Sequence, residues 1–169
     1  MNKLFKGCLQ LGVLAAVGLA GVEAHAAVTT YALPGQGGVF KNPANDPSCW
    51  SNSYGRMLHA QACGQHELDF PLTSIFGATA IGGFVNVDIG TPIPIFGSQP
   101  KACTQLLVVD PTGTSVLSTP VSCQSPSSGA TGLTIPTGTL TPPAQFYSFV
   151  AVWATYNVSI NSVSYAITK

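Results

Sequence analysis

The stretch QFYSFVAVWATY, residues 145–156, decides the fold class of this chain. In an extended strand, successive side chains point to opposite faces. One face of this stretch would carry Phe146, Val150 and Val152, and the other Tyr147, Phe149 and Trp153. Aromatic and β-branched residues favour strands, and a short run that is apolar on both faces is typical of the interior of a sheet. The stretch therefore predicts a central strand of a β protein.

The segment that follows changes its alternation partway along. It contains two sets of apolar residues with opposite parity: first Val158 and Ile160, then Val163, Tyr165 and Ile167. A shift of one residue moves every later side chain to the other face of the sheet. We therefore predict a bulge or turn near residues 161–162, which keeps both sets in the core.

The rest of the chain shows strand composition in short pieces separated by proline and glycine. The expected strands are residues 29–33, 39–40, 66–72, 84–89, 106–109 and 114–121. Within residues 84–89, Val85, Val87 and Ile89 share one face. The sequence Asp-Pro-Thr-Gly at 110–113 has the residues of a type I turn. Residues 49–63 fit either a strand pair or a disulfide-closed loop with one helical turn at 56–60.

These pieces predict an all-β fold, a two-sheet antiparallel sandwich of jelly-roll or Ig-like type, with roughly eight to ten strands. The order of the strands stays open. A long aromatic strand followed by a closing strand at the C-terminus resembles the architecture of many carbohydrate-binding jelly rolls. This resemblance implies no site residues.

The first 26 residues have the features of a secretory signal peptide. Lys3 and Lys6 precede an uncharged apolar run at 11–22, and Ala24-His25-Ala26 is a small–x–small cleavage sequence. The run is shorter than the ~20 residues that a membrane-spanning helix needs. We expect cleavage before Ala27, loss of Cys8 with the signal, and an exported chain of residues 27–169 that forms a single β-sandwich domain, extracellular or periplasmic.

Four cysteines remain in residues 27–169: Cys49, Cys63, Cys103 and Cys123. An even number in an exported chain predicts two disulfides. We favour the sequential pairs, Cys49–Cys63 and Cys103–Cys123, because each closes a short loop. Closing a loop of about 15 residues would add roughly 3 kcal/mol to the free energy of unfolding. A simple hairpin that pairs Val109 with Thr114 would place Pro120, not Cys123, opposite Cys103. The second disulfide is therefore expected where the strands splay or bulge.

Charged side chains are few, which excludes some classes of partner. The full chain has six Lys and Arg and six Asp and Glu, of which Lys3, Lys6 and Glu23 lie in the expected signal. Residues 27–169 therefore carry four positive and five negative side chains, a net charge of −1. Four scattered cations cannot form a basic stripe for nucleic acid or a polybasic membrane patch. A net charge near zero does favour self-association.

The ionisable residues give no strong catalytic or metal signature. Glu67 and Asp69 would share one face of a strand, as a glycosidase pair could, with His66 on the other face; we favour an ordinary exposed polar face. His59, Cys63 and His66, with Cys49, could form a zinc set, yet an exported chain favours the disulfide. No G-x-S-x-G motif is present. We expect no metal, no cofactor and no enzymatic activity.

Aromatic side chains carry the leading functional hypothesis. Trp50, Tyr54 and Tyr156 are the candidate ligand-binding residues, because sugar rings stack their C–H faces on such rings, whereas Trp153 is expected in the core. The leading function is an exported, non-catalytic domain that binds carbohydrate or cell-surface material. A structural subunit of a surface layer or filament is the first alternative, and a glycoside hydrolase-like enzyme using Glu67 and Asp69 is the second.

Overall fold

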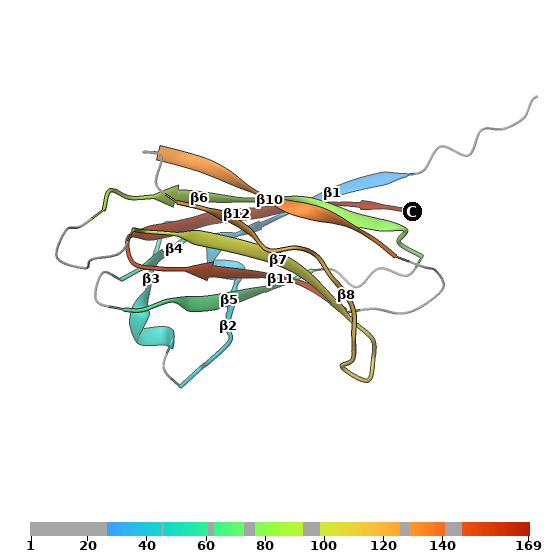
Figure 1. Ribbon diagram of the computed structural model, residues 1–169, viewed down its shortest axis with the longest axis horizontal. Coiled ribbons are helices and arrows are strands. Elements are labelled where there is room, and N and C mark those ends of the chain that lie inside the picture. Colours follow the sequence, from blue (N-terminus) through green and yellow to red (C-terminus); the bar gives the residue numbers. More distant parts are fainter. Residues whose placement is uncertain are drawn as a thin grey trace, which may run out of the picture.

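Two antiparallel β-sheets lie face to face in the computed structural model (Figure 1). The structure describes residues 27–44, 46–60, 63–72, 77–92, 99–125, 129–140 and 147–169. The strands are β1 (Val28–Pro34), β2 (Val39–Phe40), β3 (Trp50–Ser53), β4 (Arg56–His59), β5 (His66–Pro71), β6 (Ala80–Ile89), β7 (Ala102–Val109), β8 (Ser115–Ser118), β9 (Ser122–Gln124), β10 (Gly129–Thr139), β11 (Tyr147–Ala154) and β12 (Val158–Thr168). The predicted all-β, disulfide-linked sandwich is confirmed. The expected signal peptide lies outside the described residues.

Each sheet has six strands, and the order could not be read from the sequence. Sheet A runs β10-β6-β12-β4-β3, and β1 pairs with β12 beyond the end of β4. Sheet B runs β2-β5-β11-β7-β8, and β9 also pairs with β7. Two short 3₁₀ helices, η1 (Gly35–Gly37) and η2 (Asp46–Cys49), connect strands at the N-terminal end. Among the residues that the structure describes, no helix has the length and apolar character needed to cross a membrane.

The core fills the space between the two sheets. It takes Val85, Val87 and Ile89 from β6, as their alternation predicted. From sheet B it takes Leu68 and Phe70 of β5, Leu106 and Val108 of β7, and Val150 and Val152 of β11. β11, which was predicted to be a central strand, has a neighbour on each side, and so does β7.

The predicted irregularity in the last strand is confirmed. β12 changes register against β6 between Ile160 and Ser162, so Asn161 is the inserted residue. Val158 and Ile160 on one side of the bulge, and Val163, Tyr165 and Ile167 on the other, are all buried. The bulge lets one strand present both sets of apolar side chains to the same core.

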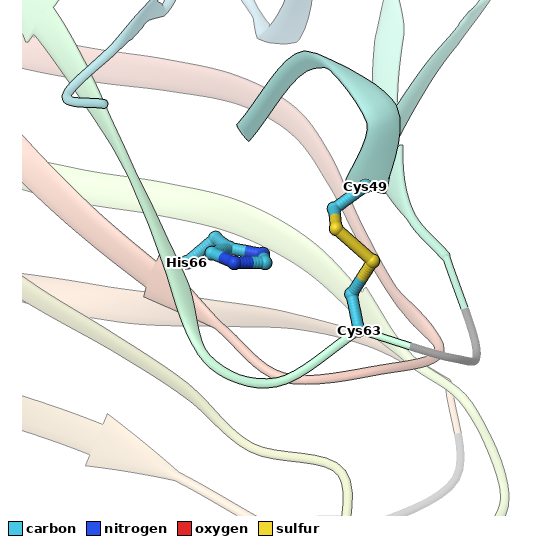
Figure 2. Close-up of side chains that lie close together, drawn as sticks. All are labelled: Cys49, Cys63 and His66. Carbon is cyan, nitrogen blue, oxygen red and sulfur yellow. A yellow bond between two sulfur atoms is a disulfide. The ribbon is translucent and has the colours of Figure 1, made fainter. Parts of the chain in front are cut away.

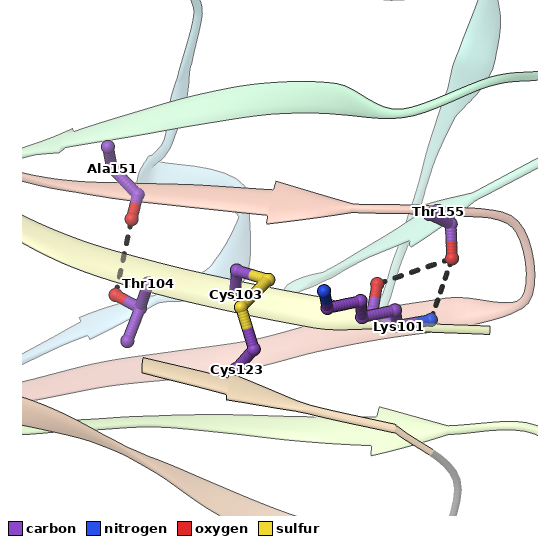
Figure 3. Close-up of a disulfide and its surroundings, with 6 residues drawn as sticks. All are labelled: Lys101, Cys103, Thr104, Cys123, Ala151 and Thr155. Carbon is purple, nitrogen blue, oxygen red and sulfur yellow. Dashed lines mark hydrogen bonds between the residues drawn. A yellow bond between two sulfur atoms is a disulfide. The ribbon is translucent and has the colours of Figure 1, made fainter. Parts of the chain in front are cut away.

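Both predicted disulfides are present, Cys49–Cys63 and Cys103–Cys123. The second joins β7 to β9, where Cys103 lies directly opposite Cys123 in a paired stretch (Figure 3). The expectation that this disulfide would lie at a splay or bulge is therefore wrong. The register changes instead between Val108 and Val109 and between β8 and β9, where Thr119 Oγ1 accepts a hydrogen bond from the Leu106 amide.

Two hydrogen-bond pairs hold β7 and the segment before it against β11 (Figure 3). Thr104 Oγ1 donates to the Ala151 carbonyl at 3.2 Å inside the sandwich. At the end of the strand, Thr155 Oγ1 accepts a bond from the Lys101 amide at 2.7 Å and also lies within bonding distance of the Lys101 carbonyl. These contacts leave little freedom at the end of sheet B that carries Trp153.

Residues 50–59 form a strand pair, so the helical alternative for 56–60 is wrong. β3 and β4 pair along their whole length, and a two-residue turn of Tyr54 and Gly55 joins them. Both turn residues have positive φ, +51° and +82°. This is the type I′ geometry that matches the twist of a hairpin, and it favours Asn-Gly.

Replacing Tyr54 with Asn should stabilise the fold. The Tyr54 side chain is fully exposed and contributes no burial, whereas its left-handed backbone is costly for a residue other than Gly, Asn or Asp. We expect Tyr54→Asn to raise the free energy of unfolding by about 1 kcal/mol, measured by urea denaturation with the disulfides intact. Tyr54→Val, which is β-branched, is the opposite control and should lower it.

Candidate functional site

The candidate site lies on the outer face of sheet B, where β2, β5 and β11 run side by side. Trp153 of β11 lies opposite Glu67 of β5, and both side chains point away from the core. The backbone amide of Lys41, just after β2, donates a hydrogen bond to the Glu67 carbonyl. The pairing of β2 with β5 therefore continues for one more residue. Three segments far apart in the sequence thereby bring an indole, a carboxylate and an amine together.

These residues line an open cleft of about 280 Å³. Its walls are Lys41, Asn42, Gln65, His66, Glu67 and Trp153. The lining combines one large aromatic ring with amide, carboxylate, imidazole and ammonium groups. Binding sites for polar organic ligands have this composition, an apolar surface with a few placed hydrogen-bonding groups.

Glu67 fixes the geometry of the cleft. Its Oε2 accepts a hydrogen bond from Trp153 Nε1, and its Oε1 forms an ion pair with Lys41 Nζ at 2.9 Å. The Glu67 side chain is 12% exposed and that of Lys41 is 56% exposed. The hydrogen bond to Glu67 raises the pKa of Lys41, with a further contribution from the charges of Glu67 and Asp69. The indole ring is therefore held in one orientation with its nitrogen already engaged.

Asp69 follows Glu67 on the same face of β5. Its Oδ1 is buried and accepts no hydrogen bond from the described residues. Burial, followed by the charge of Glu67 and a hydrogen bond with it, raises the pKa of Asp69 to about 6. Asp69 therefore keeps its proton in mildly acidic solution.

Stability should fall as the pH rises through the pKa of Asp69. The folded chain binds this proton more tightly than the unfolded chain, whose Asp pKa is near 3.8. The contribution of this proton to the free energy of unfolding is therefore complete below about pH 4 and lost above about pH 6. We expect Asp69→Asn to be more stable than the wild type at pH 8 by about 1 kcal/mol, after allowance for solvent screening, and to match it at pH 4. Urea denaturation at both pH values measures this, and an unchanged difference between them would contradict it.

Glu67 and Asp69, the two residues expected to form a glycosidase pair, lie on the outer face of β5. Both Glu67 oxygens already have partners, Oε1 in Lys41 Nζ and Oε2 in Trp153 Nε1. These contacts hold the Trp153 ring and the Lys41 amine beside Glu67.

Two further aromatic side chains share the outer face of β11 with Trp153. Tyr147 is 50% exposed and Phe149 is half-buried, and both lie on the side of the strand that carries Trp153. On the neighbouring strand β7, Val109 lies opposite Tyr147 and Leu107 opposite Phe149. The expectation that Trp153 belongs to the core is wrong, because the other face of β11 faces sheet A.

The three aromatic residues expected to bind ligand do not come together. Trp50 is 7% exposed and packs edge-on against His59, with ring centres 4.7 Å apart. Tyr156, between β11 and β12, is 3% exposed. The prediction that Trp50 and Tyr156 bind ligand is therefore wrong, because a buried ring cannot stack on a ligand. Tyr54 is fully exposed, but it lies at the tip of the β3–β4 turn in sheet A.

His59, His66 and the Cys49–Cys63 disulfide lie close together. Figure 2 shows the His66 ring beside the Cys49–Cys63 disulfide. These three residues are the only group of possible metal ligands in the described part of the chain, and the bond between the sulfurs leaves no thiolate to bind zinc. His59 Nε2 lies 3.1 Å from His66 Nδ1 and joins sheet A to sheet B.

Comparison with known proteins places the chain in no family: no family model matches it, and no curated protein matches it in sequence.

Proposed function

We propose that this protein is an exported, non-catalytic domain that binds carbohydrate on the outer face of sheet B, with the ligand centred on Trp153. The observation that carries the proposal is the open cleft in which Glu67 holds the Trp153 ring among polar side chains. The two disulfides support export, because such bonds persist in oxidising compartments.

The chemistry of the cleft suits a sugar. A pyranose ring has an apolar C–H face, which packs on an indole, and a rim of hydroxyl groups that both donate and accept hydrogen bonds. Asn42 and Gln65 supply amides, which can pair with a hydroxyl in either direction, and Lys41 supplies donors. Because Trp153 Nε1 already donates to Glu67, the ring offers its face to the ligand.

The row of rings along β11 indicates a ligand longer than one sugar. Tyr147 and Phe149 continue the aromatic surface from Trp153 along a single strand. Gln105 of β7 lies opposite Ala151, between Phe149 and Trp153, and its side-chain nitrogen is held by Ser118 and Thr119, which leaves its carbonyl oxygen as an acceptor. An outer sheet face with rings and amides suits an extended glycan lying along the strand.

Replacing Trp153 with Ala should weaken glycan binding by about 1–3 kcal/mol, or roughly 5- to 150-fold, by analogy with other stacking sites. The glycan is first identified by array screening of the purified exported protein, and its affinity is then measured by calorimetry. Trp153→Phe, which keeps a ring, should retain more affinity than Trp153→Ala.

Tyr54→Ala is the matched control, because it removes an exposed ring on the other sheet. It should bind glycan as the wild type does. If Tyr54→Ala and Trp153→Ala bind equally well while both remain folded, the ligand does not stack on Trp153. If the array shows no glycan bound at all, the carbohydrate proposal itself fails.

A further inference from the structure

Open sheet edges attract other strands, and five of the six edge strands here carry a feature that blocks pairing. β2 is two residues long and is followed by Lys41. β3 and β8 are four residues long, and β8 is also irregular against β7. β9 is three residues long and tied down by a disulfide. β10 contains Pro136 and a register shift.

β1 lacks all of these features. It is seven residues long, and its sequence VTTYALP has no charge and no proline before the last position. Its register against β12 is regular from Val28 to Pro34, and it pairs with no other strand among the described residues. Its inner side chains Tyr31 and Leu33 pack on the core, and the Tyr31 ring stacks on Tyr165 at 5.1 Å. The strand is thus anchored on one side and open on the other.

The backbone groups on the open side can be assigned from one hydrogen bond. The Lys169 amide donates to the Ala27 carbonyl at 3.0 Å, which makes this pair a hydrogen-bonded one. In an antiparallel ladder, hydrogen-bonded and non-hydrogen-bonded pairs alternate. The amides and carbonyls of Thr29, Tyr31 and Leu33 therefore face β12, whereas those of Val28, Thr30 and Ala32 face outward.

We propose that β1 pairs with β1 of a second copy of this chain, antiparallel and across a two-fold axis at Thr30. In this register Val28 of one copy lies opposite Ala32 of the other, and Thr30 lies opposite Thr30. Every outward amide and carbonyl of these three residues then finds a partner, because the same residues face outward in both copies. The pairing joins the two A sheets into one continuous sheet.

A second copy fits this edge for reasons of charge and symmetry. The segment is uncharged, and residues 27–169 carry a net charge of only −1, so two copies do not repel each other strongly. A two-fold pair uses the β1 edge of both chains and leaves none free, so the assembly closes as a dimer and does not grow into a filament. The binding face of sheet B lies in the other layer of the sandwich and stays open in both copies.

The test is sedimentation velocity on the purified exported protein over a wide range of concentrations. The wild type should show a reversible monomer–dimer equilibrium. Thr30→Pro removes an amide that faces outward while leaving the ladder to β12 intact, so the dimer Kd should rise about tenfold or more. Thr30→Ala keeps the amide and should dimerise as the wild type does. Val116→Pro, on the edge of sheet B, is the matched proline control and should also dimerise.

A second variant covers the case in which Thr30→Pro does not fold. The double variant Thr30→Lys with Ala32→Lys changes two exposed side chains and places like charges opposite each other only in the dimer. It should remain folded and monomeric. A wild type that stays monomeric at every concentration would overturn the proposal, as would a dimer that persists in the double variant.

Discussion

Deletion of Asn161 should prevent this chain from folding. The residue is the extra one in the β12 bulge, and it lets Val158 and Ile160 point into the same core as Val163, Tyr165 and Ile167. Without it, one set must turn to the outer face. Full burial of each large apolar side chain contributes about 1.5–3 kcal/mol. Exposing the second set would therefore remove a large part of a total stability of about 5–15 kcal/mol.

The control is Asn161→Ala, which keeps the bulge and removes only the side chain. Its amide donates to Asp88 Oδ2 at 3.1 Å, and its oxygen accepts a bond from Ser159 Oγ. Losing these half-buried contacts should cost about 1 kcal/mol. Both variants are compared by yield of exported protein and by thermal denaturation. A deletion variant that melts within a few degrees of Asn161→Ala would show that the register of β12 is not fixed by this residue.

The sequence predicted local features well wherever alternation or spacing determined them. Val158 and Tyr165 have opposite parity and are both apolar, which requires a bulge in any sheet buried on one face. The short spacing from Cys49 to Cys63 predicted that disulfide correctly. The sequence around Cys103 predicted the correct partner, Cys123, but wrongly placed an irregularity of the strands at this disulfide. The shift in register lies in the β8–β9 segment instead.

Alternation could not predict which face of β11 lies inside. Both faces of this strand are apolar. Alternation shows that Phe149 and Trp153 share one face and that Val150 and Val152 share the other. It does not show which of the two faces meets sheet A. That choice depends on the neighbouring strands: Glu67 and Asp69 lie beside the outer face, and Leu68 and Phe70 lie beside the inner one.

The candidate site was missed because it depends on strand order. In the sequence Glu67 stands beside Asp69, but its partners in the structure, Trp153 and Lys41, are 86 and 26 residues away. They meet only because β5 lies between β2 and β11. A half-buried carboxylate opposite a tryptophan is a signal that becomes visible once the pairing of β5 with β11 is known.

Replacing Trp50 with Ala should destabilise the fold by about 3–5 kcal/mol, the usual cost of removing a buried aromatic side chain. The ring lies against His59 beside the Cys49–Cys63 disulfide, so its removal would leave a cavity at this end of the core. Its Nε1 is buried and finds no hydrogen-bond acceptor in the described part of the chain. Trp50→Phe removes the unpaired N–H group, which should stabilise the fold, and also some buried volume, which should destabilise it. Because these effects oppose each other, the free energy of unfolding should fall by less than about 1.5 kcal/mol.

Tyr54→Ala, four residues away in the same hairpin, separates a core role from a ligand-binding role for these rings. Its side chain is fully exposed, so the free energy of unfolding should change by no more than about 0.5 kcal/mol. Urea denaturation of the three variants, with peptide mapping to confirm that Cys49–Cys63 still forms, makes the comparison. If Trp50→Ala were as stable as Tyr54→Ala, the Trp50 ring would not be part of the core. A large loss for Trp50→Ala with a small one for Trp50→Phe would show that its ring volume, and not its polar N–H group, supports this end of the sandwich.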